Sequence, residues 1–408
     1  MKKLLKKKKL WVALIVALLV PGSVAAQNRW QALAAEESTI GLDKGFIEAE
    51  TQGFNLKILK ESQLLTALQP KGSGEFDFTP SDRLESRKSN RLYHLGDLNL
   101  RIRIVDTPEW KRYSSAAGRS PVTPLAAGGT TIAAADMTPT FPQDIPLKVE
   151  RYWENREGDL VLRFRLTNSS AAPLEIGSLG IPMIFNNILD GKNLEQAHAV
   201  CSFYDPYIGQ DAGYLQVVRL DGHGPVLLVL PYGETPFEAY NPLLDDRTPR
   251  GITFEGFYEW MALSRAHAEE DWTAAEPWNH PRSVRLNPGQ SREFGVKFVL
   301  SESLREIENT LIRHKRPVAV GIPGYVVPMN VEASLFLNYG SEVVSLDVHP
   351  GGALSVKAGK PTAGGWKRFE VSGREWGRAR LTVTYADGLR QTIQYKVIKP
   401  EEEIIGDM

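Results

Sequence analysis

Residues 159–168 read DLVLRFRLTN, and apolar side chains fall at every second position from Leu160 to Leu166. The charged and polar side chains between them would point the opposite way. Alternation with a period of two is typical of a strand that buries one face and exposes the other, as strands of antiparallel sheets do. The buried face of this strand is expected to carry Leu160, Leu162, Phe164 and Leu166.

The same pattern recurs along the chain. Residues 97–104 alternate in the same way, with Asn99, Arg101 and Arg103 opposite an apolar face. That apolar face would consist of Leu98, Leu100, Ile102 and Ile104. Further strands are predicted at residues 46–51, 54–59, 146–153, 214–220, 226–230 and 294–300. The pattern predicts an all-β fold made of antiparallel sheets.

One stretch lacks this alternation. Residues 112–140 are rich in Ala, Gly, Ser, Thr and Pro and contain few large apolar side chains. This composition predicts a long surface loop or a flexible insertion.

The clearest helix is predicted at residues 304–314. Ser303 and Glu306 have the spacing of a capping box, and Pro317 would end the helix. Its apolar stripe would consist of Leu304, Ile307, Leu311 and Ile312. Six short strands are predicted after it, within about 80 residues and with Gly-containing turns, which is typical of a small β-sandwich resembling immunoglobulin-like domains.

These elements predict a domain organisation. A large β-domain is expected at residues 27–302, a connector helix at 303–316, a small β-sandwich at 317–400 and a tail at 401–408. Residues 1–26 are predicted to be a cleaved signal peptide, because a lysine-rich start precedes ten apolar residues and the small residues Val24, Ala25 and Ala26. Ten apolar residues are too few to span a bilayer, which needs about 20. We therefore expect a secreted or periplasmic protein without a membrane span after cleavage, although an uncleaved anchor is the alternative.

Composition excludes several functions. The formal net charge is −1, so no basic surface for nucleic acid is indicated. The single cysteine, Cys201, cannot form a disulfide within the chain. The sequence contains no His-Glu-x-x-His or Gly-x-Ser-x-Gly motif, no phosphate-binding loop and no dinucleotide-binding fingerprint. Neither a metal site nor a cofactor is predicted.

The most distinctive stretch for function is residues 254–280. It combines Trp260, Trp272 and Trp278 with several acidic residues, among them Glu259. Indole rings pack on the apolar faces of sugars while carboxylates accept hydrogen bonds from hydroxyl groups, so this stretch is a candidate carbohydrate-binding site. The alternative is that the indoles fill a core, or that Trp272 and Trp278 make an interdomain contact.

A second candidate binding segment is residues 203–209. Tyr204 and Tyr207 flank Asp205 and Pro206, which we expect to form a turn that presents the two rings beside the Asp205 carboxylate at a surface cleft. The alternative is that the tyrosines only cover a loop.

Paired carboxylates would be needed for glycoside hydrolysis, about 5–10 Å apart. Glu255 with Glu259, or Glu269 with Asp271, are the available pairs. Neighbouring positions in sequence do not establish that separation, and acidic loops are often only solvated, so both interpretations stay open here.

Residues 160–170, LVLRFRLTNSS, followed by PLEIGSLGIPM at 173–183, resemble the central strands of the galactose-mutarotase-like supersandwich. Residues 286–294 resemble a late strand of that domain. The helix and IPGYVVP at 322–328 then resemble DUF5695, a family of six-hairpin-glycosidase-like proteins, over most of residues 40–400. The resemblance implies that residues 27–302 form the supersandwich found ahead of a helical toroid in glycoside hydrolases and polysaccharide lyases.

The sequence ends after the small β-module, so the toroid that carries much of the active site in such proteins is expected to be absent or encoded downstream. The resulting hypothesis is a non-catalytic β-portion that binds an oligo- or polysaccharide or supports a helical catalytic domain. Two alternatives stay open, namely a complete glycoside hydrolase, lyase or epimerase that uses carboxylates of residues 254–280, and a structural envelope protein without a sugar ligand.

Overall fold

A computed structural model describes residues 28–251, 254, 256–360, 362 and 364–406. The predicted signal peptide and Glu255 lie outside the described residues. Among the described residues, no helix is long and apolar enough to cross a membrane.

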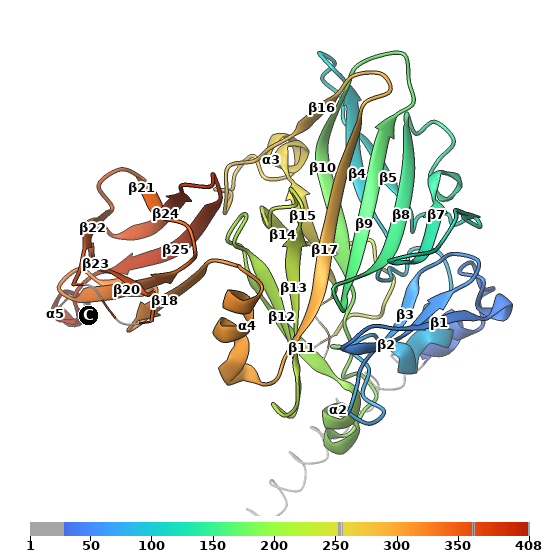
Figure 1. The fold of residues 1–408 in the computed structure, drawn as a ribbon, viewed down its shortest axis with the longest axis horizontal. Helices are drawn as coiled ribbons and strands as arrows, with labels where there is room; N and C mark the ends of the chain where they lie inside the picture. The colour runs from blue at the N-terminus through green and yellow to red at the C-terminus, as the bar shows by residue number, and fades with distance from the viewer. Residues whose placement is uncertain (1–27, 252–253, 255, 361, 363, 407–408) are drawn as a thin grey trace, which may run out of the picture.

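Two antiparallel sheets form a large sandwich (Figure 1). The eight-stranded sheet has the order β11-β12-β13-β17-β9-β8-β7-β6. Its strands are β6 (Thr123–Pro124), β7 (Thr131–Asp136), β8 (Leu147–Arg156), β9 (Asp159–Asn168), β11 (Ser202–Tyr207), β12 (Tyr214–Arg219), β13 (Val226–Tyr232) and β17 (Ser291–Ser301).

The six-stranded sheet has the order β14-β15-β10-β4-β5, with β16 paired to β10. Its strands are β4 (Asn99–Ile104), β5 (Lys111–Ser114), β10 (Leu174–Met183), β14 (Ala239–Pro242), β15 (Tyr258–Leu263) and β16 (Val284–Leu286). The alternation seen in sequence explains the packing, because Leu100 and Ile102 of β4 and Leu162 and Phe164 of β9 enter one core cluster while Arg165 of β9 is exposed.

The prediction of a long loop at residues 112–140 is wrong. The segment contains β6, β7, the end of β5 and the 3-10 helix η3 (Thr138–Thr140). Strand β7 buries Ala133, Ala134 and Ala135 beside β8. Small side chains fit a strand in close contact with its neighbours, and this packing cannot be recognised from a period of large apolar residues.

Two further segments differ from expectation. The turn predicted around Tyr204 and Asp205 is wrong, because these residues belong to β11, an edge strand in which Pro206 does not disrupt a central ladder. The helix α2 (Leu194–Val200) before it was not predicted, although Asn193 and Gln196 form its capping box.

A three-stranded sheet precedes the large sandwich in sequence. It consists of β1 (Phe46–Glu50), β2 (Phe54–Leu59) and β3 (Leu65–Pro70), flanked by the 3-10 helices η1 (Leu42–Lys44) and η2 (Ser81–Arg87). Phe54, Leu56 and Leu68 join the core of the large sandwich.

The connector after β17 contains the 3-10 helix η4 (Leu304–Glu306) and α4 (Ile307–Arg313). The Ser303 side chain makes no cap hydrogen bond, so the predicted capping box is wrong. Ile307 and Leu311 pack against Val318 and the outer face of β13 and β17 through Leu228 and Val299. The helix therefore rests on the eight-stranded sheet.

Two four-stranded sheets form a small sandwich beside the large one (Figure 1). One has the order β18-β20-β23-β22, with β18 (Val318–Ile322), β20 (Glu332–Asn338), β22 (Leu354–Ala358) and β23 (Lys367–Gly373). The other has the order β19-β25-β24-β21, with β19 (Val326–Pro328), β21 (Val343–His349), β24 (Gly377–Tyr385) and β25 (Arg390–Ile398). A short helix, α5 (Glu401–Gly406), follows.

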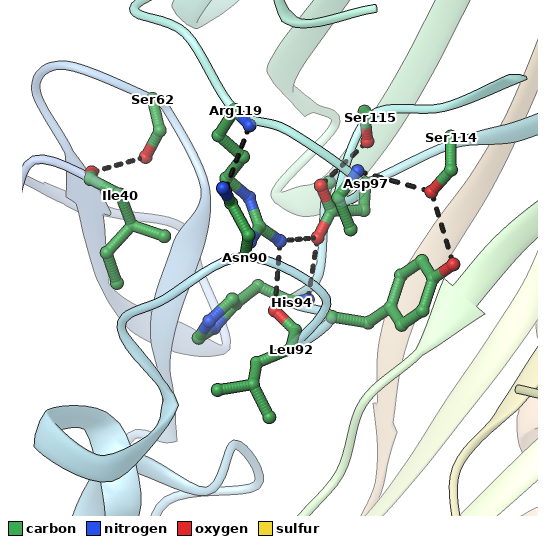
Figure 2. A network of polar contacts seen from close by, with 12 residues as sticks. Ile40, Ser62, Asn90, Leu92, His94, Asp97, Ser114, Ser115 and Arg119 are labelled. Carbon is green, nitrogen blue, oxygen red and sulfur yellow. Dashed lines mark hydrogen bonds and ion pairs between the residues drawn. The ribbon is translucent and has the colours of Figure 1, made fainter. Parts of the chain in front are cut away.

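A buried ionic network fixes the loop between η2 and β4 (Figure 2). The Asp97 carboxylate accepts hydrogen bonds from Arg119 (2.6 Å), the Ser115 hydroxyl (2.7 Å) and the His94 backbone amide (2.8 Å). Both side chains of the Asp97–Arg119 ion pair are 2% exposed. Burial would raise the pKa of Asp97, but the charge of Arg119 and the hydrogen bonds outweigh it and hold the pKa below its ordinary value.

Two more buried arginines hold the same loop. Arg87 donates to the Tyr93 carbonyl (2.6 Å), lies 3.6 Å from the Asp246 carboxylate and stacks on the Phe257 ring. Arg151 donates to the Gly96 carbonyl (2.6 Å) and to the Ser62 carbonyl. Burial lowers the pKa of His94 to about 3, so its imidazole is neutral beside these cations. The Tyr93 and Gly96 carbonyls and the Asp97 carboxylate thus all have partners within the protein, whereas the Nε atoms of Arg87, Arg119 and Arg151 have none among the described residues.

Replacing one partner of this network should lower the stability of the folded protein. We expect Asp97→Asn to lower the free energy of unfolding at pH 7 by about 3–5 kcal/mol, because the Arg119 guanidinium stays buried without its counter-charge. Urea denaturation measures the loss. Because the folded-state pKa of Asp97 lies below its unfolded value, the difference from the parent chain should shrink as pH falls below about 4. Asp43→Asn, at an exposed ion pair, is the control and should leave stability unchanged; equal effects of the two variants would contradict the network's role.

Candidate functional site

A cavity of about 790 Å³ lies over the outer face of the six-stranded sheet. Its floor comes from the polar side of the strands, with Asn99 and Arg101 on β4, Asn241 on β14 and Glu259 on β15. Its walls come from β5, from loops and from α3 (Arg265–Glu270) with the residues after it. The wall residues are Tyr93, Arg112, Tyr113, Ser114, Ala117, Pro142, Leu243, Leu244, Asp245, His267, Asp271 and Trp272. We refer to it as the Glu259 cavity.

Glu259 is held in the floor by two amides. Asn99 donates to its Oε2 (2.7 Å) and Asn241 to its Oε1 (3.0 Å), and the residue is 4% exposed. Burial raises the pKa of Glu259 above its ordinary value despite these hydrogen bonds. The carboxyl group therefore keeps its proton to a higher pH than an exposed glutamate, and it can donate as well as accept.

A glycine on the central strand makes room for this carboxyl group. A Cβ at Gly180 would lie 2.1 Å from Glu259 Oε2, so any side chain there would displace the carboxyl group. Gly177 likewise leaves room for the Trp110 indole, since a Cβ there would lie 2.2 Å from the ring. Every residue of β10 is buried.

Tyr93 and Asp245 form one wall. The Tyr93 hydroxyl donates to Asp245 Oδ2 (3.0 Å) and lies 3.1 Å from the Ser114 hydroxyl. The Tyr93 backbone amide donates to Asp246 Oδ2 (2.9 Å), which ties the tyrosine to the buried network. Burial and the Asp245 charge raise the pKa of Tyr93, so its phenol stays protonated.

His267 and Trp272 form the opposite wall, with ring centroids 5.2 Å apart. His267 is 6% exposed, and burial, with the nearby charge of Arg101, lowers its pKa to about 3. Its Nδ1 has no hydrogen-bond partner among the described residues. A neutral imidazole with an unpaired ring nitrogen therefore lines the cavity beside an indole.

The acidic run Glu269, Glu270 and Asp271 is not a free acidic loop. Arg101 donates to Glu270 (2.7 Å) and to Asp271, while Arg103 pairs with Glu269 (3.1 Å). Burial would raise the pKa values of Glu269 and Asp271, but hydrogen bonds and charges from the arginines and Trp110 outweigh it and lower both. These carboxylates dock α3 onto the sheet, which gives the Glu269–Asp271 pair a structural role.

The predicted site residues fall in three places. Glu259 and Trp272 meet in the Glu259 cavity. Tyr204 lines a second, mainly aromatic cavity of about 600 Å³, where its hydroxyl donates to the Gly256 carbonyl (3.2 Å). The neighbouring Asp205 is exposed on β11 and accepts from Gln216 (3.4 Å). The two candidate segments, residues 254–280 and 203–209, therefore contribute to different cavities.

Two of the candidates lie where the sandwiches meet, which was the alternative for Trp278. The Tyr207 hydroxyl donates to the Thr392 carbonyl (2.9 Å) and accepts from Gln391 (3.2 Å). The Trp278 carbonyl accepts from Gln394 (2.8 Å) and Arg380 (3.2 Å). Both residues therefore help join the large sandwich to β24 and β25.

Trp260 belongs to the core. It is 0% exposed, stacks on Phe237 at 3.9 Å between centroids and donates to the Pro236 carbonyl (3.0 Å). Its indole cannot reach a sugar, so its assignment as a binding residue is corrected to the core alternative.

Sequence reasoning missed most of the cavity. Asn99, Arg101 and Asn241 lie on the polar faces of strands, and the 97–104 alternation marks the first two as outward-facing. Tyr93, Asp245 and His267 come from loops and from a short helix, and no spacing in the sequence connects them. Among the described residues, no three His, Cys, Asp or Glu side chains gather as a metal ion would require.

Residues 57–408 match the model of DUF5695, described as a family of unknown function, which confirms the resemblance noted from the strand patterns. No curated protein matches the sequence significantly.

One solved structure shares the fold over most of this chain. A polysaccharide lyase is similar with a TM-score of 0.63 and 14% identity, over 88% of this chain and 48% of the lyase. The chain thus spans about half of that protein's length. A protein described as an aldose 1-epimerase from Escherichia coli K12 has a TM-score of 0.34 and 7% identity, over 63% of this chain and 99% of its own. A galactose mutarotase-like protein from Lactobacillus casei has a TM-score of 0.38 and 12% identity, over 63% and 100%.

The docking of α3 can be tested by hydrogen exchange. We expect Arg101→Ala to speed amide exchange in residues 265–272 by about tenfold or more, because a charge-assisted hydrogen bond contributes about 1.5–3 kcal/mol. Lowering the pH below the depressed pKa values of Glu269 and Asp271 should have the same effect in the parent chain. Arg165→Ala, at an exposed position of the opposite sheet, is the control. Unchanged exchange in Arg101→Ala would show that the ion pairs do not hold the helix.

Proposed function

Since the chain belongs to the DUF5695 family, we propose that it is an exported carbohydrate-active protein that binds the sugar units of an oligo- or polysaccharide in the Glu259 cavity. Neither the family description nor the fold names a ligand, so the proposal rests on the chemistry of the cavity.

The observation that carries it is the combination of ring surfaces and oriented polar groups around one cavity. Trp272 offers apolar surface, while Glu259, Asp245 and Asn99 offer polar groups. A sugar ring requires such alternation of flat apolar and directed polar contacts. The volume of about 790 Å³ suits a small oligosaccharide.

Export is the second part of the proposal. It is supported by the order of lysines, apolar run and small residues in 1–26. A helical catalytic domain encoded downstream, as in the sequence expectation, is a partner compatible with this role.

Proton transfer to a bound sugar is a second candidate function, favoured by one observation. The buried Glu259 carboxyl has a raised pKa and faces the same cavity as Asp245, whose charge contributes to that rise. A protonated carboxylic acid beside an ionised one is the arrangement that acid–base chemistry on glycosides uses. Glu259 would donate the proton and Asp245 would accept one.

Binding can be tested by calorimetry with short neutral oligosaccharides found in a glycan-array screen. Asp245→Ala and Trp272→Ala should each weaken binding about tenfold, because each removes a hydrogen-bonding charge or a stacking surface. Glu234→Ala removes an exposed carboxylate elsewhere and should not change affinity. Absence of binding to every glycan, or equal affinity in all variants, would contradict the cavity proposal.

The catalytic candidate has its own test. If Glu259 is the acid, Glu259→Gln should abolish turnover of a glycan that still binds, and the parent rate should fall as pH rises through the raised pKa of Glu259. Turnover that persists in Glu259→Gln would leave the cavity as a binding site only. Reducing-sugar release and absorbance of unsaturated products measure hydrolysis and elimination separately.

A further inference from the structure

The outer face of β24 and β25 carries a row of cations between two exposed indoles. Arg378 lies opposite Lys396 across these strands, and Arg380 lies opposite Gln394. Ala379, Leu381 and Tyr395 point to the opposite, buried face. Positions 378 and 380 of β24 share one face and are spaced by about 6.6 Å, since a strand rises about 3.3 Å per residue. Trp376 precedes the strand, and the contact of its ring with Lys396 places it beside this face.

Each indole of this row is covered by one cation and stays accessible. The Arg378 guanidinium lies 4.7 Å from the Trp278 ring, and the Lys396 ammonium lies 4.8 Å from the Trp376 ring. Trp278 is 45% exposed and Trp376 is 66% exposed. Both rings therefore present open surface although a cation sits on each.

The row continues from the contact between the two sandwiches. Thr392 of β25 is covered by Asn279 and Tyr207 of the large sandwich, and the Trp278 carbonyl covers the next pair, Arg380 and Gln394. Past this pair the same face is not covered by the large sandwich. There Val326, which pairs with Lys396, is 56% exposed and adds apolar surface. The large sandwich thus forms a ledge along one end of an exposed cationic and aromatic strip.

We propose that this strip, made of Trp278, Trp376, Arg378, Arg380 and Lys396, binds an acidic polysaccharide. The indoles would stack on sugar rings, and the cations between them would pair with the carboxylates or sulfates that such a chain carries at regular intervals. The inference shares with the proposed function the premise of a glycan ligand, but it uses none of the residues that line the Glu259 cavity.

The charges around the strip agree with an anionic ligand. The acidic groups that face it are Glu276, whose charge acts on Arg380, and Asp347 of β21, which lies opposite Thr382 beyond the last cation. His349 lies opposite Arg380. Arg378 and Lys396 therefore stand side by side between the two indoles, and Arg380 follows at the Trp278 carbonyl. No carboxylate lies among positions 376, 378, 380, 394 and 396.

Affinity electrophoresis of the purified chain in gels that contain polygalacturonate tests the strip. We expect retardation that weakens as salt rises, and none in gels that contain neutral dextran. The double variant Arg378→Ala, Lys396→Ala should lose at least about tenfold in affinity, and Trp376→Ala should lose a similar amount at constant charge. Dextran sulfate in a parallel gel distinguishes sulfate from carboxylate recognition.

The matched control is Lys357→Ala, Lys367→Ala, which removes two exposed cations from the other sheet of the same sandwich. If this control is retarded as strongly as the parent chain, binding depends on the strip. An equal loss of affinity in both double variants would show a general charge effect and would overturn the proposal. Binding to vesicles of anionic phospholipid without binding to either acidic polysaccharide would also overturn it. Because the cavity is tested with neutral oligosaccharides and Asp245→Ala, either proposal can fail without the other.

Discussion

The ion pair between Asp97 and Arg119 is the constraint on which the candidate site depends. It anchors a loop that carries no regular secondary structure between η2 and β4, and Arg87 and Arg151 hold the same loop through its carbonyls. Tyr93 is placed at the cavity wall because its amide and carbonyl are both taken by this network. A buried charge pair is a weak source of net stability, but losing one partner is expensive, so it specifies a single loop conformation.

A second set of charged side chains, nearer the surface, attaches α3 to the six-stranded sheet. Arg101 and Arg103 project from the polar face of β4 and hold the acidic end of α3, which brings His267 and Trp272 over the sheet. These pairs are partly exposed, so salt and acid weaken them more readily than the buried network. The cavity therefore has one rigid wall around Tyr93 and one wall whose attachment depends on solution conditions.

The sequence allowed the all-β class, the strands of both sandwiches and the family resemblance to be predicted, because alternation and Gly-containing turns are local signals. It allowed Glu259 and Trp272 to be proposed but not their meeting with Tyr93 and Asp245, since contacts across 150 residues leave no local spacing. Trp260 shows the limit most clearly, because an indole on a strand has the same sequence signature whether it stacks on Phe237 or on a sugar. The small-residue strand β7 was missed because close packing needs no large apolar side chains.

The contact between the sandwiches has a consequence for divergence among relatives. Many of its hydrogen bonds end on main-chain oxygens, such as those of Thr392, Ile208 and Trp278. Every amino acid supplies these atoms, so substitutions at the acceptor positions need not alter the joint. The two sandwiches can therefore keep the same orientation while the side chains at the acceptor positions change, provided that the donors Tyr207, Arg380 and Gln394 are kept.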